Sequence, residues 1–188
     1  MESFLKIMRV AGVNFPVAAS FIQISNELDA IKIKQRLDAL EDPISVLHKD
    51  LPALSQVIYF ALVKNDSFTL NFRDEIYTKY SRAFAILDIK GLIKKYIELG
   101  SSYPVEIEVT DPCFILYLCT RFEDTKKMDL LLERVENCEV GQWLNGYELQ
   151  DEIQLPIVFI KAVFNVYQAN GFGICSKETR ACSYLASA

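Results

Sequence analysis

The stretch YELQDEIQLPIVFIKAVFNVYQANGFGICS, residues 147–176, decides the fold of the C-terminal part of this chain. Its spacing predicts a short helix from Tyr147 to Ile153, a tight corner at Gln154 to Pro156, and a longer helix from Ile157 to Ala169. Asn170-Gly171 then supplies a left-handed stop, because glycine adopts positive φ without steric cost. The chain is expected to continue as a strand.

Two strands are predicted after this stop, Phe172 to Cys175 and Ala181 to Leu185, with Ser176 to Arg180 at the tip of the hairpin. Two helices joined by a tight corner and followed by a β-hairpin resemble the winged helix-turn-helix superfamily. In that superfamily the second helix commonly enters the major groove of DNA, and the hairpin is called the wing. The resemblance covers about 45 residues and is one of pattern.

A similar outline occurs earlier in the chain. Leu51 to Lys64 and residues 74–90 read as helices, with a strand from Phe68 to Phe72 between them. Two strand-like runs follow, Leu92 to Leu99 and Val105 to Val109, so residues 92–110 would form the wing. This half resembles a degenerate winged helix, because the first helix of a helix-turn-helix is hard to see.

Helices connect the two units. Asp111 is expected to cap the helix that follows it, with Pro112 at the first helical position. The next helix is predicted from about Asp124 to Val135. The expected fold class is therefore mainly α with small β wings, in three parts: an N-terminal helical segment (1–48), a first, degenerate winged-helix domain (49–121) and a second winged-helix domain (122–188).

Residues 4–24 are apolar, but Lys6, Arg9, Asn14 and Pro16 interrupt them, so they are too broken for a transmembrane span. We expect a buried or partner-docking helix that breaks near Pro16, or alternatively an interfacial amphipathic anchor. From Asn26 a further helix is predicted, with an apolar seam from Ala30 to Ile44.

Composition is that of an ordinary globular protein, with 51% hydrophobic and 24% charged residues and a net charge of −5. The five cysteines form no CxxC pair and the single histidine, His48, is distant, so no metal site is expected. An odd number of cysteines without a cleavable signal favours reduced thiols and a cytoplasmic location.

The charges are distributed unfavourably for DNA binding by the second unit. Residues 122–188 hold six basic and ten acidic side chains. On a helical wheel the outward positions of the longer helix are predicted to be Ile157, Val158, Lys161, Asn165 and Gln168. Two aliphatic residues at its N-terminal end suit a groove on another protein better than a base edge, and the alternative is that both belong to the core. These five residues are the predicted partner-binding site.

The first unit is the better candidate for DNA. Its predicted basic surface consists of Arg73, Lys79, Arg82, Lys94 and Lys95. Such residues would give weak, salt-sensitive binding to phosphates. Acidic neighbours dilute this field, so a solvated face of mixed charge is the alternative explanation.

The sequence predicts no enzyme. His48 has no evident catalytic partner, and the seven glycines are scattered at boundaries without forming a phosphate-binding loop. We therefore expect no catalytic residue, no cofactor and no small-molecule substrate.

Acidic tandem winged helices resemble the accessory subunits that bind the kleisin in SMC complexes, and also tandem winged-helix subunits of some membrane-sorting complexes. The resemblance implies a non-enzymatic, protein-binding subunit of a larger, DNA-associated prokaryotic complex, SMC-like or active in antiviral (phage) defence. Its partner would be an ATPase or nuclease subunit, or a second copy. The alternative is a DNA-binding transcriptional regulator that uses the first winged helix and dimerises through its N-terminal helices.

Overall fold

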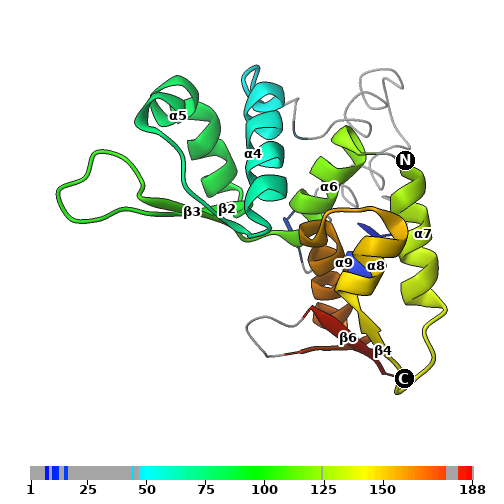
Figure 1. Ribbon diagram of the computed structural model, residues 1–188. Helices are drawn as coiled ribbons and strands as arrows, with labels where there is room; N and C mark the ends of the chain where they lie inside the picture. Colours follow the sequence, from blue (N-terminus) through cyan, green and yellow to red (C-terminus); the bar gives the residue numbers. More distant parts are fainter. Residues whose placement is uncertain are drawn as a thin grey trace, which may run out of the picture.

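The computed structural model describes residues 7, 8, 10–12, 15, 16, 44, 47–123, 125–176 and 182–187. The chain is mainly helical, with two small antiparallel sheets that each follow helices (Figure 1). This is the fold class expected from the sequence.

The first unit consists of two helices and one three-stranded sheet. Its elements in chain order are α4 (Leu51–Asn65), β1 (Thr69–Leu70), α5 (Asp74–Ile89), β2 (Ile93–Tyr96) and β3 (Glu106–Val109). The strand order is β1–β3–β2, because the first strand pairs with the far strand of the hairpin. The β2–β3 hairpin projects away from the rest of the molecule (Figure 1).

The second unit repeats this topology. After α6 (Pro112–Phe122) and α7 (Thr125–Glu136) come β4 (Trp143–Asn145), α8 (Gly146–Ile153), α9 (Ile157–Ala169), β5 (Gly173–Cys175) and β6 (Ser183–Ala186). The strand order is β4–β6–β5. Helices followed by a sheet of the same strand order thus occur twice, which is compatible with two winged-helix-like units.

The predicted helix ends follow from local stereochemistry. The Asp111 carboxylate accepts hydrogen bonds from the backbone N atoms of Cys113 (2.7 Å) and Phe114 (3.2 Å), so it caps α6 as expected. Gly91 and Gly171 have φ values of 70° and 81° and end α5 and α9. Both wing hairpins pair as the sequence predicts.

Two features of the units were not expected. Tyr80 has non-helical angles (φ −111°, ψ 20°), so α5 consists of two helical segments joined at a kink. The strand β4 was not predicted, because three residues are too few for a period-2 pattern and its partner β6 lies about 40 residues further along the chain.

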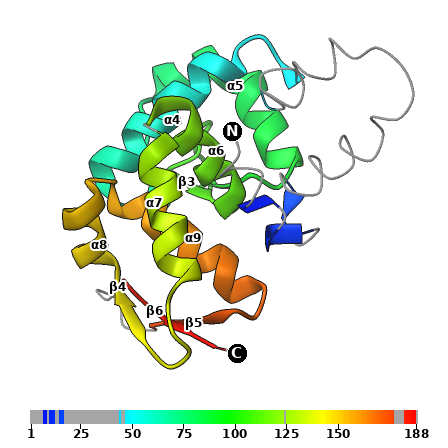
Figure 2. The same cartoon turned by 90° about the vertical axis from the view of Figure 1, so that its right-hand side faces the viewer.

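The two units share one hydrophobic core. Helix α6 packs against both α4 and α9 and lies between them (Figure 2). At this seam the ring of Tyr59, on α4, stacks on Phe159 of α9 with centroids 6.0 Å apart, and its hydroxyl donates to Glu123 at 2.7 Å. The domain boundaries at 48/49 and 121/122 stay predictions.

Of the N-terminal segment, Ile7, Met8, Ala11 and Ile44 are described and lie buried in the same core. Phe15 and Pro16 are described but residues 13, 14 and 17–43 are not, so the predicted break near Pro16 stays a prediction. The helix from Asn26, most of its seam and the tip of the second wing after Ser176 lie outside the described residues. Within the described part of the chain, no helix has both the length and the apolar character needed to cross a membrane.

Candidate functional site

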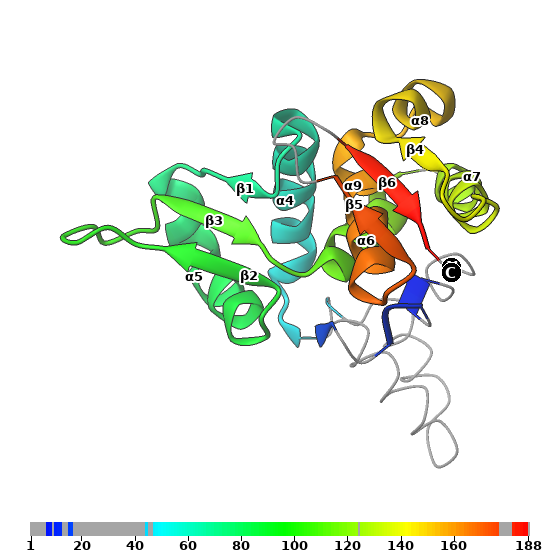
Figure 3. The same ribbon diagram turned by 90° about the horizontal axis from the view of Figure 1, so that it is seen from below.

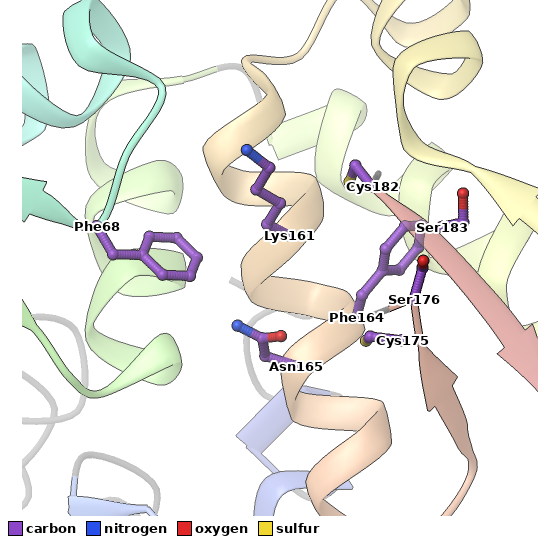
Figure 4. Close-up of a pocket in the computed structure, with 8 residues that line it drawn as sticks. All are labelled: Phe68, Lys161, Phe164, Asn165, Cys175, Ser176, Cys182 and Ser183. Carbon is purple, nitrogen blue, oxygen red and sulfur yellow. The ribbon is translucent and has the colours of Figure 1, made fainter. Parts of the chain in front are cut away.

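The outward face of α9 is turned toward the first unit. Lys161 donates from Nζ to the backbone oxygen of Asp66, at the end of α4, over 3.4 Å. In Figure 4, Lys161 and Asn165 extend from α9 on the side where Phe68 of the first unit lies. An open pocket of about 190 Å³ is lined there by side chains of both units: Phe68, Lys161, Phe164, Asn165, Cys175, Ser176, Cys182 and Ser183.

Gln168, the last predicted partner-binding residue on α9, has an internal role. Its side-chain oxygen accepts a hydrogen bond from the backbone N of Cys175 over 2.6 Å. This bond connects the C-terminal turn of α9 to the first strand of the wing hairpin. Lys161, Asn165 and Gln168 therefore lie on one helix face, but this face contacts the rest of the chain.

The predicted outward placement of Ile157 and Val158 is wrong. Both side chains are buried, with exposed fractions of 2% and 0%. The helical wheel assumed that α9 is covered on one side, whereas α4, α6, α8 and β5 all pack against it. The alternative weighed from the sequence, that both belong to the core, describes their position.

Two acidic residues, Asp66 and Asp151, lie near the N-terminal end of α9. A cavity of about 340 Å³ at the α8–α9 corner is lined by Val63, Asp66, Gln150, Asp151, Gln154, Leu155 and Pro156. The carboxylates of Asp66 and Asp151 lie where a DNA-reading helix would present basic or amide groups to base edges. Lys127 Nζ donates to the backbone oxygen of Gln154 at the same corner over 2.7 Å, so the charge there is mixed.

The predicted basic surface of the first unit is divided by its sheet. Lys95 pairs with Ile107 on the inner face, and its Nζ lies 2.9 Å from the Asp88 carboxylate. Lys94 pairs with Glu108 on the outer face. Lys94 Nζ also lies 4.8 Å from the ring centroid of Tyr96. The two lysines thus point to opposite sides of the sheet, and each has an internal partner.

The other three predicted basic residues lie exposed on α5 or directly before it. Arg73 immediately precedes the helix, and Lys79 and Arg82 lie on its exposed face. Lys79 Nζ lies 4.9 Å from the ring centroid of Tyr80. The structure therefore does not gather the five predicted DNA contacts into one patch.

Exposed apolar side chains occur at several places that the sequence did not single out, including both sheets. Ile97 and Leu99 lie exposed in the β2–β3 hairpin, beyond the paired residues. Trp143, Phe172 and Ile174 are about half exposed around the second sheet. The alternation Gly173–Ile174–Cys175 signals an outward Ile174, but Trp143 could be found only through its pairing with β6.

Thiols and His48 form no metal site among the described residues. All five cysteines are free, and burial raises the pKa of the Cys175 and Cys182 thiols to about 11. His48 Nδ1 accepts a hydrogen bond from the backbone N of Asp50 at 3.2 Å and lies 3.7 Å from that residue's carboxylate.

Comparison of the chain with protein-family models, with curated proteins and with solved structures gave no match.

Proposed function

We propose that this chain is a non-enzymatic tandem winged-helix protein that binds other proteins, as an accessory subunit of a larger DNA-associated complex of the SMC-like or phage-defence kind. The observation that carries this proposal is the hydrogen bond from Lys161 to Asp66, which turns the exposed face of α9 onto the first unit.

Topology supports the winged-helix assignment. In each sheet the first strand joins the far strand of the hairpin, which gives the orders β1–β3–β2 and β4–β6–β5. The kink at Tyr80 supports the same assignment for the first unit, because the two segments of α5 would correspond to the two helices of a helix-turn-helix.

Steric and electrostatic arguments favour protein over DNA as the partner. The major groove is about 12 Å wide, so a reading helix needs a free side along its length. Helix α9 is contacted by α4, α6, α8 and β5, and its N-terminal end opens onto Asp66 and Asp151. In the first unit, Lys95 is neutralised by Asp88.

DNA binding is still supported only by the basic residues at α5, which are Arg73, Lys79 and Arg82. A fluorescence-anisotropy titration of labelled duplex at two salt concentrations tests it. We expect binding no tighter than the nonspecific range, roughly 10⁻⁴ to 10⁻⁶ M at physiological salt. Lys79→Glu with Arg82→Glu should then change little, as should the matched pair Lys64→Glu with Lys126→Glu elsewhere on the surface. Tight, sequence-selective binding that Lys79→Glu with Arg82→Glu abolishes would contradict this proposal. It would favour the alternative, a DNA-binding transcriptional regulator.

Protein binding is tested in the organism that encodes the chain. A tagged copy should recover a defined partner, and the double substitution Ile97→Glu, Leu99→Glu in the exposed hairpin should reduce that recovery at least several-fold. Both side chains are exposed, so the fold should be preserved, as far-UV circular dichroism would verify. Recovery of no protein at stoichiometric amounts would count against the accessory-subunit role.

A further inference from the structure

Lys161 is a partly buried cation without an acidic partner. It is the only charged residue of α9, and its Nζ donates to the backbone oxygen of Asp66 over 3.4 Å. Among the described residues, no carboxylate forms an ion pair with this nitrogen. A lysine ammonium has three N–H donors, so one long bond to a carbonyl leaves donors available. Withdrawing an unpaired charge from water is unfavourable, and a bound anion would offset this cost.

The pocket beside Lys161 combines this cation with apolar and neutral polar groups. Its volume is about 190 Å³. Phe68 of the first unit and Phe164 of α9 provide aromatic lining, while Asn165 and Ser183 provide an amide and a hydroxyl. No acidic side chain is among the described residues that line it. In a chain with a net charge of −5, a pocket whose one charged group is a lysine suits an anion.

Asn165 supplies a second donor for the same anion. It lies one helical turn after Lys161, and both side chains extend to the same side of α9, toward Phe68 (Figure 4). The amide of Asn165 makes no hydrogen bond with another group in the part of the chain that the structure describes. Polar groups that are partly withdrawn from water normally have a hydrogen-bond partner. An amide N–H and an ammonium both donate to a carboxylate, and the charged donor forms the stronger bond.

The charge of Lys161 acts inside the pocket. Burial raises the pKa of the Cys182 thiol, which lines the pocket, to about 11, and the Lys161 ammonium acts in the opposite direction. A nearby cation favours the ionised form of an acid. A carboxylic acid bound beside Lys161 would therefore be held as the carboxylate.

The pocket lies where the two units meet. Phe68 directly precedes β1 of the first sheet, and the other lining residues belong to α9 and to the β5–β6 hairpin of the second unit. Seen from below, the two sheets lie on either side of α4 (Figure 3). Ligand pockets occur preferentially at junctions of this kind. A ligand bound here would contact both units.

We infer that this pocket binds a small carboxylate that carries an aromatic or branched apolar group. The Lys161 ammonium and the Asn165 amide hold the carboxylate, and the apolar group packs against Phe68 and Phe164. An apolar cavity of about 150 Å³ holds a benzene ring, so about 190 Å³ is enough for a ring and a carboxylate. A single ammonium suits a monoanion, whereas a nucleic-acid backbone requires several cations.

The inference goes beyond the proposed function and does not depend on it. The carboxylate is bound unchanged, so the chain stays non-enzymatic. Two sources present the required chemistry: a free organic acid, and the C-terminal residue of a polypeptide with an apolar side chain. The two sources share a carboxylate next to an apolar group, and the experiment separates them.

The test is a titration of the complete, ¹⁵N-labelled chain with phenylacetate, followed by nuclear magnetic resonance. The backbone amide signals of Phe68, Lys161 and Asn165 should shift along one saturation curve. The expected Kd is on the order of a millimolar, because the ligand is small. Phenylacetamide has the same shape without the charge and should bind roughly tenfold more weakly, since it forms no charge-assisted hydrogen bond.

Substitutions of Lys161 test the role of the ammonium. Lys161→Met keeps an unbranched side chain without the charge and should weaken phenylacetate binding to the level of phenylacetamide. Lys161→Arg keeps the charge and should retain most of the affinity. The matched control Lys64→Met removes the same charge from an exposed position in the last turn of α4 and should change nothing. Far-UV circular dichroism verifies the fold, and the comparison of phenylacetate with phenylacetamide needs no variant.

N-acetylphenylalanine and its C-terminal amide separate the two sources. Binding of N-acetylphenylalanine as tight as that of phenylacetate, with weaker binding of its amide, would show that the pocket accepts the end of a polypeptide. Binding of phenylacetate without binding of N-acetylphenylalanine would support the inference for a free organic acid.

Three results would overturn the inference. The first is the absence of shifts at the pocket residues up to about 20 mM phenylacetate, well above the expected Kd. The second is equal binding of phenylacetate and phenylacetamide. The third is unchanged binding by a folded Lys161→Met chain. None of these concerns the recovery of a protein partner or the binding of duplex DNA, so a failure here is distinct from a failure of the proposed function.

Discussion

Lys161 Nζ donates to the backbone oxygen of Asp66 over 3.4 Å and so connects α9 of the second unit with the end of α4 in the first. Beneath this contact, Tyr59 of α4 stacks on Phe159 of α9. The face of α9 that carries Lys161 and Asn165 is thus turned toward the first unit. The stability of the two units should therefore be coupled.

Phe159→Ala tests this coupling. Phe159 is fully buried, and its removal should lower the free energy of unfolding by about 3–5 kcal/mol. Urea unfolding followed by Trp143 fluorescence reports on the second unit, and amide hydrogen exchange in α5 reports on the first. Both should be destabilised together in one transition, because the ring packs between the units. Two separate transitions, with α5 unaffected, would show that the units are independent.

Val158→Asp should unfold the chain. The side chain of Val158 has no exposed surface, so the substitution buries an unpaired carboxylate and should cost more than about 4 kcal/mol. Gln56→Glu is the matched control, since it adds the same charge to an exposed position of helix α4 and should change stability by less than about 0.5 kcal/mol. Circular dichroism during urea titration measures both. A Val158→Asp chain that stays folded but no longer binds a partner would contradict the burial of Val158. It would support the predicted outward placement of this residue.

Gly146→Ala should destabilise the second unit, although alanine is normally the better helix former. A Cβ at this position would contact Sγ of Cys182 and lie 2.9 Å from the backbone oxygen of Cys182. Overpacking of this kind costs about 1–3 kcal/mol. Adding Cys182→Ala should recover only part of the loss, because the backbone oxygen stays. Thermal unfolding of the single and double variants measures the recovery, and an unchanged midpoint for Gly146→Ala would contradict the packing.

Stability should decline in the alkaline range, in part through Cys182. Burial raises the pKa of this thiol from its ordinary 9.0 to about 11, so the folded chain keeps a proton that the unfolded chain releases. The resulting stabilisation is complete below pH 9 and is lost as the pH rises through about 11. It should amount to on the order of 1 kcal/mol, since the thiol is partly screened by solvent. Urea titrations at several pH values should show a shallower decline for Cys182→Ala. Parallel declines in the two proteins would show that this thiol does not contribute.

Much of the fold was predictable because its signals are local. The α9 helix begins and ends at the predicted residues, Ile157 and Ala169, since a tight corner and Asn170-Gly171 limit it. The cap by Asp111 was predictable for the same reason: a carboxylate and the free N–H groups it binds lie within three residues.

The candidate site was predictable only in part. The sequence identified α9 as the distinctive element and named Lys161, Asn165 and Gln168 on its more exposed side. It could not show that this side faces Phe68 and Asp66, which lie almost 100 residues earlier. Lys94 and Lys95 are adjacent in sequence, yet the pleat of β2 separates them, and the pairing of Lys95 with Asp88 depends on how α5 packs on that strand.

The sequence by itself determined the order of the helices and of the strands other than β4, most of the caps and turns that delimit them, and the acidic balance of the second unit. These depend on backbone preferences and side-chain charges over a few neighbouring residues. Only the tertiary structure decided which faces are covered: it buried Ile157 and Val158, turned Lys161 of α9 toward the first unit, and aligned Trp143, Leu185 and Ile174 on one face of the second sheet. Exposure depends on contacts between segments far apart in the chain, and no local pattern of residues specifies those contacts.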